Sequence, residues 1–436
     1  MLRLFIAIVV GKTILFLTRF LKVGGGSAAP GLYGLKICPD LVSILAKQIP
    51  INVIITGTNG KTTTSRMLAH FAKSNNLKVL RNSTGSNLER GIASALISSF
   101  HILSGKLEKF DLAIWEMDEA AFNSVVNKIN PSVIVFLNLF RDQLDRYGEV
   151  NTVLKKWTGT LKLLNPDSLI ILNGDDFNIA TLKDDFKGKT VLFGLDEFKV
   201  TGENRKGKAQ KLDYEAENIK TEGLEGCSFQ ITMNHELLTI NLPLPGIYHI
   251  YDFLAAFISA YHLNLDINIS IESLKDFSPA FGRVEKFEMT HPVWKAKKEG
   301  YIFLIKNPAG AGHVFATLKE HIKKEDTLLL ALNDNFADGK DVSWIWDANF
   351  EEFRVQNSEC RVICSGTRAY DLAVRLKYSG VEARNIEVIP SLDKAFQDSK
   401  RGLNGRLYIL PTYTAMLQLQ DILVKSKIKK EYWREE

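Results

Sequence analysis

The feature that most constrains this chain of 436 residues is a glycine turn between two apolar segments. Residues 51–56 are an almost continuous apolar run, which suits a strand buried on both faces of a parallel sheet. Residues 57–64 then read Gly-Thr-Asn-Gly-Lys-Thr-Thr-Thr, and residues 65–72 carry apolar side chains at helical spacing. Strand, glycine turn and helix in this order gather N–H groups around a phosphate. The sequence therefore predicts a nucleotide-phosphate site.

The residues of this loop have distinct expected roles. Lys61 is expected to reach the β- and γ-phosphates, and Thr62 to hold Mg²⁺. The general P-loop pattern has a further glycine where this chain has Ile55, so the match is to a shorter variant. The alternative is a glycine turn before an ordinary amphipathic helix. The predicted nucleotide-binding residues of the loop are Gly57, Thr58, Asn59, Gly60, Lys61, Thr62 and Thr63.

The composition is that of an ordinary globular protein with room for two or three domains, since 45% of the residues are hydrophobic and 24% charged. A net charge of +5 is mild and gives no reason to expect nucleic acid as a partner. Four cysteines are too few for a disulfide scaffold. Cys360 and Cys364 flank a strand-like segment and are predicted to be core residues, which fits a reducing cytoplasm.

The N-terminal segment allows two interpretations. Leu2 to Leu21 is largely apolar, but Lys12 and Arg19 interrupt it, whereas a membrane-spanning helix needs about 20 residues with few or no charges. A secretory signal would sit badly with a nucleotide-binding domain directly downstream. The segment is predicted to be a helix that lies either on the membrane surface or against the protein. Residues 24–34 are rich in Gly, Ser, Ala and Pro and are predicted to be a linker.

Strand-like apolar runs at residues 53–56, 112–116, 133–138 and 169–173 alternate with helical patterns up to about residue 195, which predicts a doubly wound, mostly parallel α/β sheet. Residues 200–240 are polar and are predicted to be an insertion with a β-hairpin. A second alternation from about residue 286 predicts a smaller α/β domain without its own phosphate loop. The predicted divisions are 1–40, a helix and linker; 41–285, an ATP-binding central domain; and 286–436, a C-terminal domain.

Polar residues at the ends of the predicted strands are the next candidates, because ligands bind beyond the carboxyl ends of the strands in such sheets. Glu116 ends the second strand and offers Mg²⁺ an oxygen ligand, the alternative being a solvated strand end. Asp118 and Glu119 are expected to start the next helix. Asn138 and the polar cluster after it suit nucleotide or metal contacts, or equally an N-cap with helix charge pairs.

Two further regions carry candidate residues. Arg283, at the predicted domain junction, has the planar fork that suits phosphate and could reach the γ-phosphate on domain closure. Residues 333–347 follow a strand of the second domain and hold four aspartates among aromatic side chains. Loops carry function disproportionately, so this one is a candidate site. The alternative is a network of Asp and Asn side chains that cap backbone groups.

Together these segments resemble the Mur ligases, a family of ATP-dependent peptidoglycan ligases, over about residues 35–425. Within that family the chain is most similar to the MurT-type subunit of lipid II isoglutaminyl synthase. Segments 306–310, 333–347 and 411–414 are similar to C-terminal segments of that subunit. The resemblance implies a Mur-type central P-loop domain and a smaller Rossmann-like C-terminal domain.

The resemblance also implies a reaction. Mur ligases transfer the γ-phosphate of ATP to a carboxylate, and an amine then attacks the acyl phosphate. The MurT type amidates the α-carboxylate of D-glutamate in the lipid II stem peptide, with ammonia from a GatD-type glutamine amidotransferase subunit. The implied catalytic residues are Lys61, Glu116 and Arg283, together with Asp341, which would orient a histidine of that partner. The implied location is the cytoplasm, where the inner face of the membrane presents lipid II.

The chain departs from the family pattern in two places. Relatives of the MurT type commonly carry a four-cysteine zinc ribbon, but the corresponding region here has only Cys227, so no zinc is expected. The family pattern expects Asn at positions 249 and 252, where this chain has His249 and Asp252. An ionised Asp252 can still bind the nucleotide by accepting a hydrogen bond from the adenine amino group, but it cannot donate one, so base specificity is the property in question.

Two rival functions remain at the level of the sequence. One is a stand-alone ligase that adds an amino acid to a carboxylate, as folylpolyglutamate or muramyl-peptide ligases do. The absence of a substrate domain of usual Mur ligase size before the phosphate loop counts against it. The other is a nucleotide-dependent scaffold for a partner protein, which the departures at His249 and Asp252 keep open.

Overall fold

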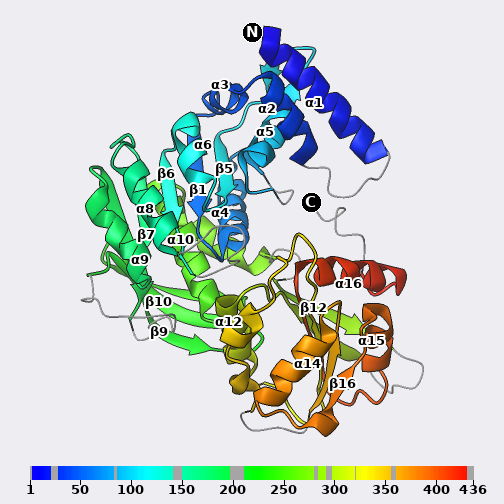
Figure 1. Cartoon of the computed structure of the whole chain (residues 1–436). Helices are drawn as coiled ribbons and strands as arrows, with labels where there is room; N and C mark the ends of the chain where they lie inside the picture. The colour runs from blue at the N-terminus through cyan, green and yellow to red at the C-terminus, as the bar shows by residue number, and fades with distance from the viewer. Residues whose placement is uncertain are drawn as a thin grey trace.

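The structure is a computed structural model, shown in Figure 1. Its described parts exclude the side chains of Arg19, Arg283, Phe353 and Arg354. They comprise residues 2–20, 28–82, 86–140, 150–196, 211–278, 283–290, 297–319, 321–354 and 360–429.

The central domain is built on a nine-stranded sheet with the order β11-β10-β9-β8-β7-β6-β1-β5-β2. Along this order, each strand from β9 to β2 is parallel to its neighbour. The two pairs β9–β10 and β10–β11 at the other edge are antiparallel. β1 lies between β5 and β6, so the direction of winding reverses there. The strands are β1 (Ile51–Thr56), β2 (Val79–Arg81), β5 (Leu112–Met117), β6 (Val133–Phe136), β7 (Leu169–Asn173), β8 (Lys189–Leu195), β9 (Tyr214–Thr221), β10 (Cys227–Met233) and β11 (Glu236–Leu242).

Helices cover both faces of this sheet because successive side chains of its buried strands point to opposite sides. On β1, Ile54 packs into the core beneath α3, α5, α6, α8 and α9, whereas Val53 and Ile55 pack into the core beneath α4 and α10. The helices are α3 (Leu41–Ala46), α4 (Lys61–Ser74), α5 (Glu89–Ser98), α6 (Phe122–Ile129), α8 (Val150–Leu161), α9 (Phe177–Ala180), α10 (Tyr248–His262) and α11 (Ile267–Ser273); β3 (Phe100–His101) and β4 (Lys106–Leu107) form a small separate hairpin.

The C-terminal domain has a six-stranded sheet with the order β12-β13-β17-β14-β15-β16, parallel except for the β12–β13 pair. Two separate cores line its faces, one beneath α12 and α14 and the other beneath α15 and α16. The strands are β12 (Arg283–Met289), β13 (Lys298–Phe303), β14 (Thr327–Ala331), β15 (Arg361–Ser365), β16 (Ile386–Val388) and β17 (Leu407–Pro411); the helices are α12 (Pro308–Leu318), α13 (Trp344–Asp347), α14 (Ala369–Tyr378), α15 (Leu392–Ser399) and α16 (Tyr413–Lys425).

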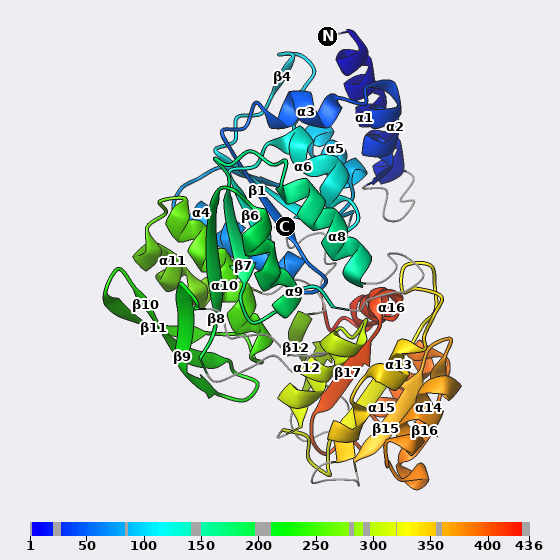
Figure 2. The ribbon, with the colours of Figure 1, turned by 60° about the vertical axis from the view of Figure 1, so that its left-hand side comes forward.

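Two antiparallel helices, α1 (Leu2–Phe20) and α2 (Ala29–Ile37), pack on α5 at the end of the molecule farthest from the C-terminal domain (Figures 1 and 2). The predicted linker over residues 24–34 is therefore wrong from residue 29 onward. Pro30 occupies the first turn of α2, where it is tolerated, and Gly31 lets the helix approach α5 closely. Among the described residues, no helix is both long and apolar enough to cross a membrane.

The predicted α/β class with a doubly wound, mostly parallel sheet is confirmed. The polar insertion contributes β9, β10 and β11 to the edge of the large sheet, and residues 200–210 lie outside the described part of the chain. Cys360 and Cys364 are buried core residues, as predicted, and all four cysteines are free thiols. Burial raises the pKa of the Cys364 thiol to about 12, which leaves it protonated and unreactive.

Candidate active site

The phosphate loop lies at the carboxyl end of β1, where the winding of the sheet reverses and ligands characteristically bind. Gly57 has φ +136° and Gly60 has φ +89°, conformations that favour glycine. A Cβ at position 60 would also lie 2.2 Å from Asp252 Oδ1 of α10. The two glycines therefore allow the loop to turn tightly into α4 and to pack against Asp252.

Lys61 begins α4, and its buried ammonium group folds back over the loop. Lys61 Nζ donates to the carbonyl oxygen of Gly57 and lies 3.3 Å from that of Thr58 and 3.4 Å from Glu119 Oε2. Of the two residues expected to start the next helix, Asp118 does so, since its carbonyl oxygen accepts from the N–H of Phe122, where α6 begins. Glu119 is buried and precedes that helix, so the expectation is wrong for Glu119. The loop thus holds a buried positive charge beside the N-terminus of α4, where phosphate oxygens would bind.

Glu116 lies at the carboxyl end of β5 within a network of hydroxyl groups. Thr62 Oγ1 donates to Glu116 Oε2 over 2.8 Å, and Ser65 Oγ donates to Glu116 Oε1 over 2.6 Å. Arg81 of β2 forms a partly buried ion pair with the same carboxylate at 3.1 Å. The Thr62 hydroxyl and the Glu116 carboxylate are hard oxygen donors beside a phosphate site, and this donor set fits Mg²⁺, which commonly completes its shell with water and phosphate oxygens.

Asn138 follows β6 and braces the phosphate loop from the other side. Its Oδ1 accepts from the Asn59 N–H at 2.8 Å, and its Nδ2 donates to the Asn59 carbonyl at 3.0 Å. The Asn138 carbonyl also accepts from the Thr58 N–H at 3.0 Å. Asn138 therefore fixes the loop backbone, and it also lines the cavity described below.

Side chains of the C-terminal domain reach the same loop. Asn307 Nδ2 donates to Asn59 Oδ1 at 3.1 Å, and Asn59 Nδ2 donates to Asn307 Oδ1 at 3.3 Å. Lys306 Nζ lies 3.3 Å from the Thr58 carbonyl. Asn307 also caps α12 by accepting from the Gly310 N–H, so the N-terminus of this helix begins beside the phosphate loop. Two lysines and two helix N-termini thus converge where an anion would bind.

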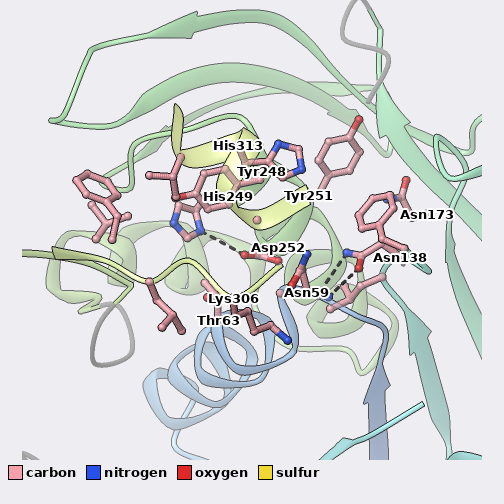
Figure 3. A pocket seen from close by; sticks show the side chains of 18 residues that line it. Asn59, Thr63, Asn138, Asn173, Tyr248, His249, Tyr251, Asp252, Lys306 and His313 are labelled. Atoms are coloured by element: carbon pink, nitrogen blue, oxygen red, sulfur yellow. Dashed lines mark hydrogen bonds and ion pairs between the residues drawn. The ribbon is translucent and has the colours of Figure 1, made fainter. Parts of the chain in front are cut away.

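A cavity that is open to solvent extends from the phosphate loop between the two domains (Figure 3). Three neighbouring rings line one part of it, since the centroid of the Tyr248 ring lies 4.2 Å from that of His249 and 5.6 Å from that of His313, with the rings tilted against one another in both pairs. A ring-lined cavity continuous with a phosphate loop suits the base and ribose of a nucleotide. Its lining residues include Asn59, Gly60, Thr63, Asn138, Asn173, Tyr248, His249, Tyr251, Asp252, Lys306 and His313.

Asp252 and His249 form a buried pair on α10. His249 Nδ1 and Asp252 Oδ2 are 3.2 Å apart, and Thr64 Oγ1 donates to Asp252 Oδ1 at 3.3 Å. Within the described structure, His249 Nε2 is buried without a hydrogen-bond partner. Burial lowers the pKa of His313 to about 4, with His249 acting in the same direction and Asp252 opposing it. The imidazole of His313 is therefore neutral at pH 7.

The polar residues after β7 have structural partners. Asp176 caps α9 by accepting from the N–H groups of Asn178 and Ile179, and it also accepts from the Leu139 N–H. Asp175 accepts from the hydroxyl of Tyr251 at 2.7 Å. These contacts fix the loops on one side of the cavity.

The loop of residues 333–347 combines the two interpretations that its sequence allows. Asp338 is buried and accepts from the Thr414 N–H at 2.7 Å, which is the expected backbone capping. Asp334 accepts from the Thr367 hydroxyl at 2.8 Å and pairs with Arg368. Asp341 differs because its side chain is exposed, with Oδ1 accepting from the Ser343 N–H at 2.8 Å.

Some predicted residues lie outside the described structure. The side chain of Arg283 is among them, as is the part of the polar cluster after Asn138 that spans residues 141–145. Within the described residues, no group of three or more His, Cys, Asp or Glu side chains has an arrangement that could hold a metal ion.

Comparison with known proteins places this site in a family. Residues 55–260 match the Mur ligase middle domain, and residues 304–416 match the MurT ligase C-terminal domain. The chain is 31% identical to the lipid II isoglutaminyl synthase (glutamine-hydrolyzing) subunit MurT of Staphylococcus aureus (strain COL), over 92% of this chain and 93% of that one. The chain belongs to the MurT family of Mur ligases. The corresponding subunit of Streptococcus pneumoniae is 30% identical, over 93% of this chain and 94% of that one.

The MurT-type chain also has the fold of solved Mur ligases. The MurF ligase of Thermotoga maritima, solved in complex with ADP, superposes with a TM-score of 0.65 at 14% identity, over 90% of this chain and 85% of that one. This likeness concerns the fold alone. Family membership makes the chain an ATP-dependent ligase with a Mur-ligase-type role in peptidoglycan synthesis, which counts against the scaffold alternative.

The structure brings the loop residues together with Glu116 and Asn138, as the strand-end argument expects. It also brings Asp252 of α10 to the loop, a residue that only the family pattern singles out. Lys306 and Asn307 were not predicted as site residues, although Asn before Pro308 after a strand signals a helix N-terminus. Ser65 and Arg81 were also missed, because no local pattern connects them to Glu116.

Proposed function

We propose that this chain is the ATP-dependent synthetase subunit that amidates the α-carboxylate of D-glutamate in the lipid II stem peptide, giving D-isoglutamine. The observation that carries the proposal is the match, over 92% of the chain, to subunits named for lipid II isoglutaminyl synthase. The contact of Lys306 and Asn307 with the phosphate loop supports it, because it forms a single site from both domains.

In this proposal the nucleotide binds with its phosphates on the loop of residues 57–63 and its base in the ring-lined cavity. Lys61 and Lys306 neutralise phosphate charge as the γ-phosphoryl group moves to the substrate carboxylate. Thr62 and Glu116 would hold Mg²⁺, which supplies further neutralisation of phosphate charge. Arg283 is proposed to add positive charge from the domain junction.

The product of this first step is an acyl phosphate, which water would hydrolyse. Closure of the C-terminal domain over the loop, through the Asn59–Asn307 pair, excludes water from it. Ammonia then attacks the acyl carbon and phosphate leaves, giving the amide.

The ammonia is proposed to come from a glutamine amidotransferase subunit that docks beside Asp341. Asp341 is exposed, and so are the nearby side chains Phe336 and Trp346, which supports a protein contact at this loop. The Asp341 carboxylate would orient the catalytic histidine of that subunit, as the third member of a nucleophile triad does. The location in this proposal is the cytoplasm, at the inner face of the cell membrane.

The test is reconstitution. The chain is co-expressed with a GatD-type Cys/His glutaminase, and the complex receives lipid II, ATP, Mg²⁺ and glutamine. The expected result is a stem peptide lighter by about 1 Da, the mass change from carboxylate to amide, with ADP and phosphate released. ATP turnover without amide formation would overturn the assignment of lipid II as the substrate. Amide formation with an added amino acid but without the partner would favour the stand-alone ligase.

A further inference from the structure

The N-terminal helix α1 is apolar on both of its faces, but the protein covers only one of them. Leu4, Ala7 and Ile8 are buried in the core that includes α5. A Cβ at Gly11 would lie 2.9 Å from the Ile97 side chain, so the packing on this face is tight. This face packs against the protein, as expected from the interpretation in which the N-terminal helix lies against the protein.

The opposite face of α1 carries large apolar side chains into solvent. Leu2, Phe16 and Phe20 are 74%, 67% and 74% exposed, and Phe5, Ile6 and Leu17 are also exposed. Residues 5 and 6 lie three and four positions after Leu2, residues 16 and 17 lie four and three positions before Phe20, and at about 3.6 residues per turn the two groups fall on the same stripe of the helix. We call these six residues the α1 face. An exposed apolar stripe of this size normally marks a surface that binds something, so the α1 face needs a covering that the described chain does not supply.

The charge around the α1 face is of one sign. Residues 1–39 contain five basic residues and no acidic one, the first acidic residue being Asp40. The chain as a whole has 55 basic and 50 acidic residues, so the part after residue 39 has no net formal charge. The whole excess of positive charge therefore belongs to the segment that carries the α1 face.

We infer that the α1 face docks on an anionic lipid surface, with the helix lying in the plane of the interface. Aromatic and aliphatic side chains on a helix flanked by basic residues bind such surfaces through apolar burial and attraction to lipid headgroups. Docking of a second copy is disfavoured, because it would bring two basic segments together with no acidic side chain from either of them.

The geometry of the molecule suits this arrangement. Figures 1 and 2 show α1 and α2 at the opposite end of the molecule from the C-terminal domain. Docking through α1 therefore leaves the C-terminal domain at the end away from the lipid surface. The inference adds a binding surface that is separate from the nucleotide site, and it does not depend on the proposed reaction.

The test is flotation of the full chain with vesicles. Unaltered protein is expected to partition onto vesicles of equal parts phosphatidylglycerol and phosphatidylcholine, more weakly onto phosphatidylcholine alone, and less as salt is raised. The triple variant Phe5→Ser, Phe16→Ser, Phe20→Ser is expected to lose at least about tenfold in partition coefficient. Arg3→Glu with Lys36→Glu, both exposed positions, is expected to weaken binding to the anionic vesicles alone.

The matched control is Phe177→Ser, Leu237→Ser, Ile269→Ser, three exposed apolar positions on other elements, which is expected to partition like the unaltered chain. Circular dichroism spectra and melts of all variants test whether the helix content and the stability of the chain are retained. Three outcomes overturn the inference: no partition of unaltered protein onto anionic vesicles, equal partition of the α1 triple variant, or loss in that variant of a dimer or of glutaminase co-purification. The last outcome would mean that the α1 face binds a protein and not a lipid surface.

Failure of the proposed reaction is distinguishable from failure of this inference. If the amidation is right, the α1 triple variant is expected to amidate a water-soluble stem-peptide substrate at the normal rate and vesicle-embedded lipid II more slowly. If the amidation is wrong, vesicle partition still reports on the α1 face.

Discussion

Asp341 is the residue on which the proposed ammonia supply depends. Replacing Asp341 by Asn keeps the shape of the side chain and its contact with the Ser343 N–H, but it removes the charge that would stabilise a partner histidinium. We expect glutamine-dependent amidation to fall by about 100-fold or more, while ATP binding is unchanged. The measurement is glutamate release and amide formation by the complex.

Two comparisons isolate that role. Asp347→Asn changes another exposed aspartate of the same loop and is expected to leave glutamine hydrolysis intact. Ammonium chloride supplied to the Asp341→Asn complex is expected to restore amide formation, because the synthetase site is unchanged. Normal glutamine hydrolysis by Asp341→Asn would exclude the triad role.

His249 is predicted to select the nucleotide base. The ionised Asp252 carboxylate beside it accepts a hydrogen bond from His249 Nδ1, which then carries the ring proton. The buried Nε2 is therefore left as a hydrogen-bond acceptor. Such an acceptor matches the 6-amino group of adenine and repels the 6-oxo group of guanine. The amide of an asparagine both donates and accepts hydrogen bonds. We therefore expect His249→Asn to lower the Kd for GTP divided by the Kd for ATP by about tenfold.

The control for this change is His262→Asn at the end of the same helix, away from the lining of the cavity. Its nucleotide preference is expected to match that of the unaltered chain. A preference that His249→Asn leaves unchanged in isothermal titration would show that another group selects the base.

At the scale of elements, the α2–α5 contact depends on the absence of a side chain at Gly31. A Cβ there would lie 1.8 Å from the Arg90 carbonyl oxygen, a backbone atom that yields only if the helices separate. We expect Gly31→Ala to lower the free energy of unfolding by about 2 kcal/mol or more, measured by urea denaturation. It is also expected to weaken the docking of α1, which packs on α2.

Gly312→Ala is the matched control, because position 312 lies inside α12 and a Cβ there would meet nothing within 4 Å. Alanine has the higher helix propensity, so this change is expected to stabilise the chain by about 0.5–1 kcal/mol. Equal effects of the two substitutions would contradict the close helix contact.

Elements with long apolar runs could be predicted from the sequence, and others could not. β1, β5, β6 and β7 lie where their apolar segments indicate, because burial on both faces leaves a continuous pattern. The helix α2 was mistaken for a linker, because its glycines serve a contact with α5 that no local pattern reveals.

The site shows the same limit. The meeting of Thr62 with Glu116 follows from the rule that ligands bind at the carboxyl ends of parallel strands, and this pair could be predicted. The contact between Asn59 and Asn307 joins residues 248 positions apart in two domains. Such a contact depends on how the domains dock, which a single sequence does not encode in any local pattern.

At the scale of the whole molecule, the cavity between the domains makes stability depend on pH. Burial lowers the pKa of His313 from 6.5 to about 4 in the folded chain, with the neighbouring Asp252 opposing this shift and His249 adding to it. Between these two pH values the unfolded chain therefore binds more protons than the folded chain. The free energy of unfolding consequently falls as pH is lowered from about 6.5 toward 4. We expect His313→Gln to flatten the fall of the melting temperature across that window, with His101→Gln at an exposed position as the unchanged control.

The closed arrangement of the two domains rests in part on the reciprocal amide pair of Asn59 and Asn307. Asn307→Ser keeps a good N-cap for α12 but is too short to reach Asn59. We expect it to lower kcat/KM for ATP by about fivefold to tenfold, since each hydrogen bond contributes about 1 kcal/mol, while the melting temperature stays constant. Asn59→Ala removes the same pair from the other domain and is expected to cost a similar factor.

The double variant decides whether the pair acts as a unit. If the two side chains act through each other, the combination of Asn59→Ala and Asn307→Ser is expected to be no slower than the slower single variant. Losses that multiply would mean that each asparagine contacts the nucleotide independently, and the pair would then have no part in closure. Steady-state kinetics of the four proteins with the same partner and substrate give the coupling directly.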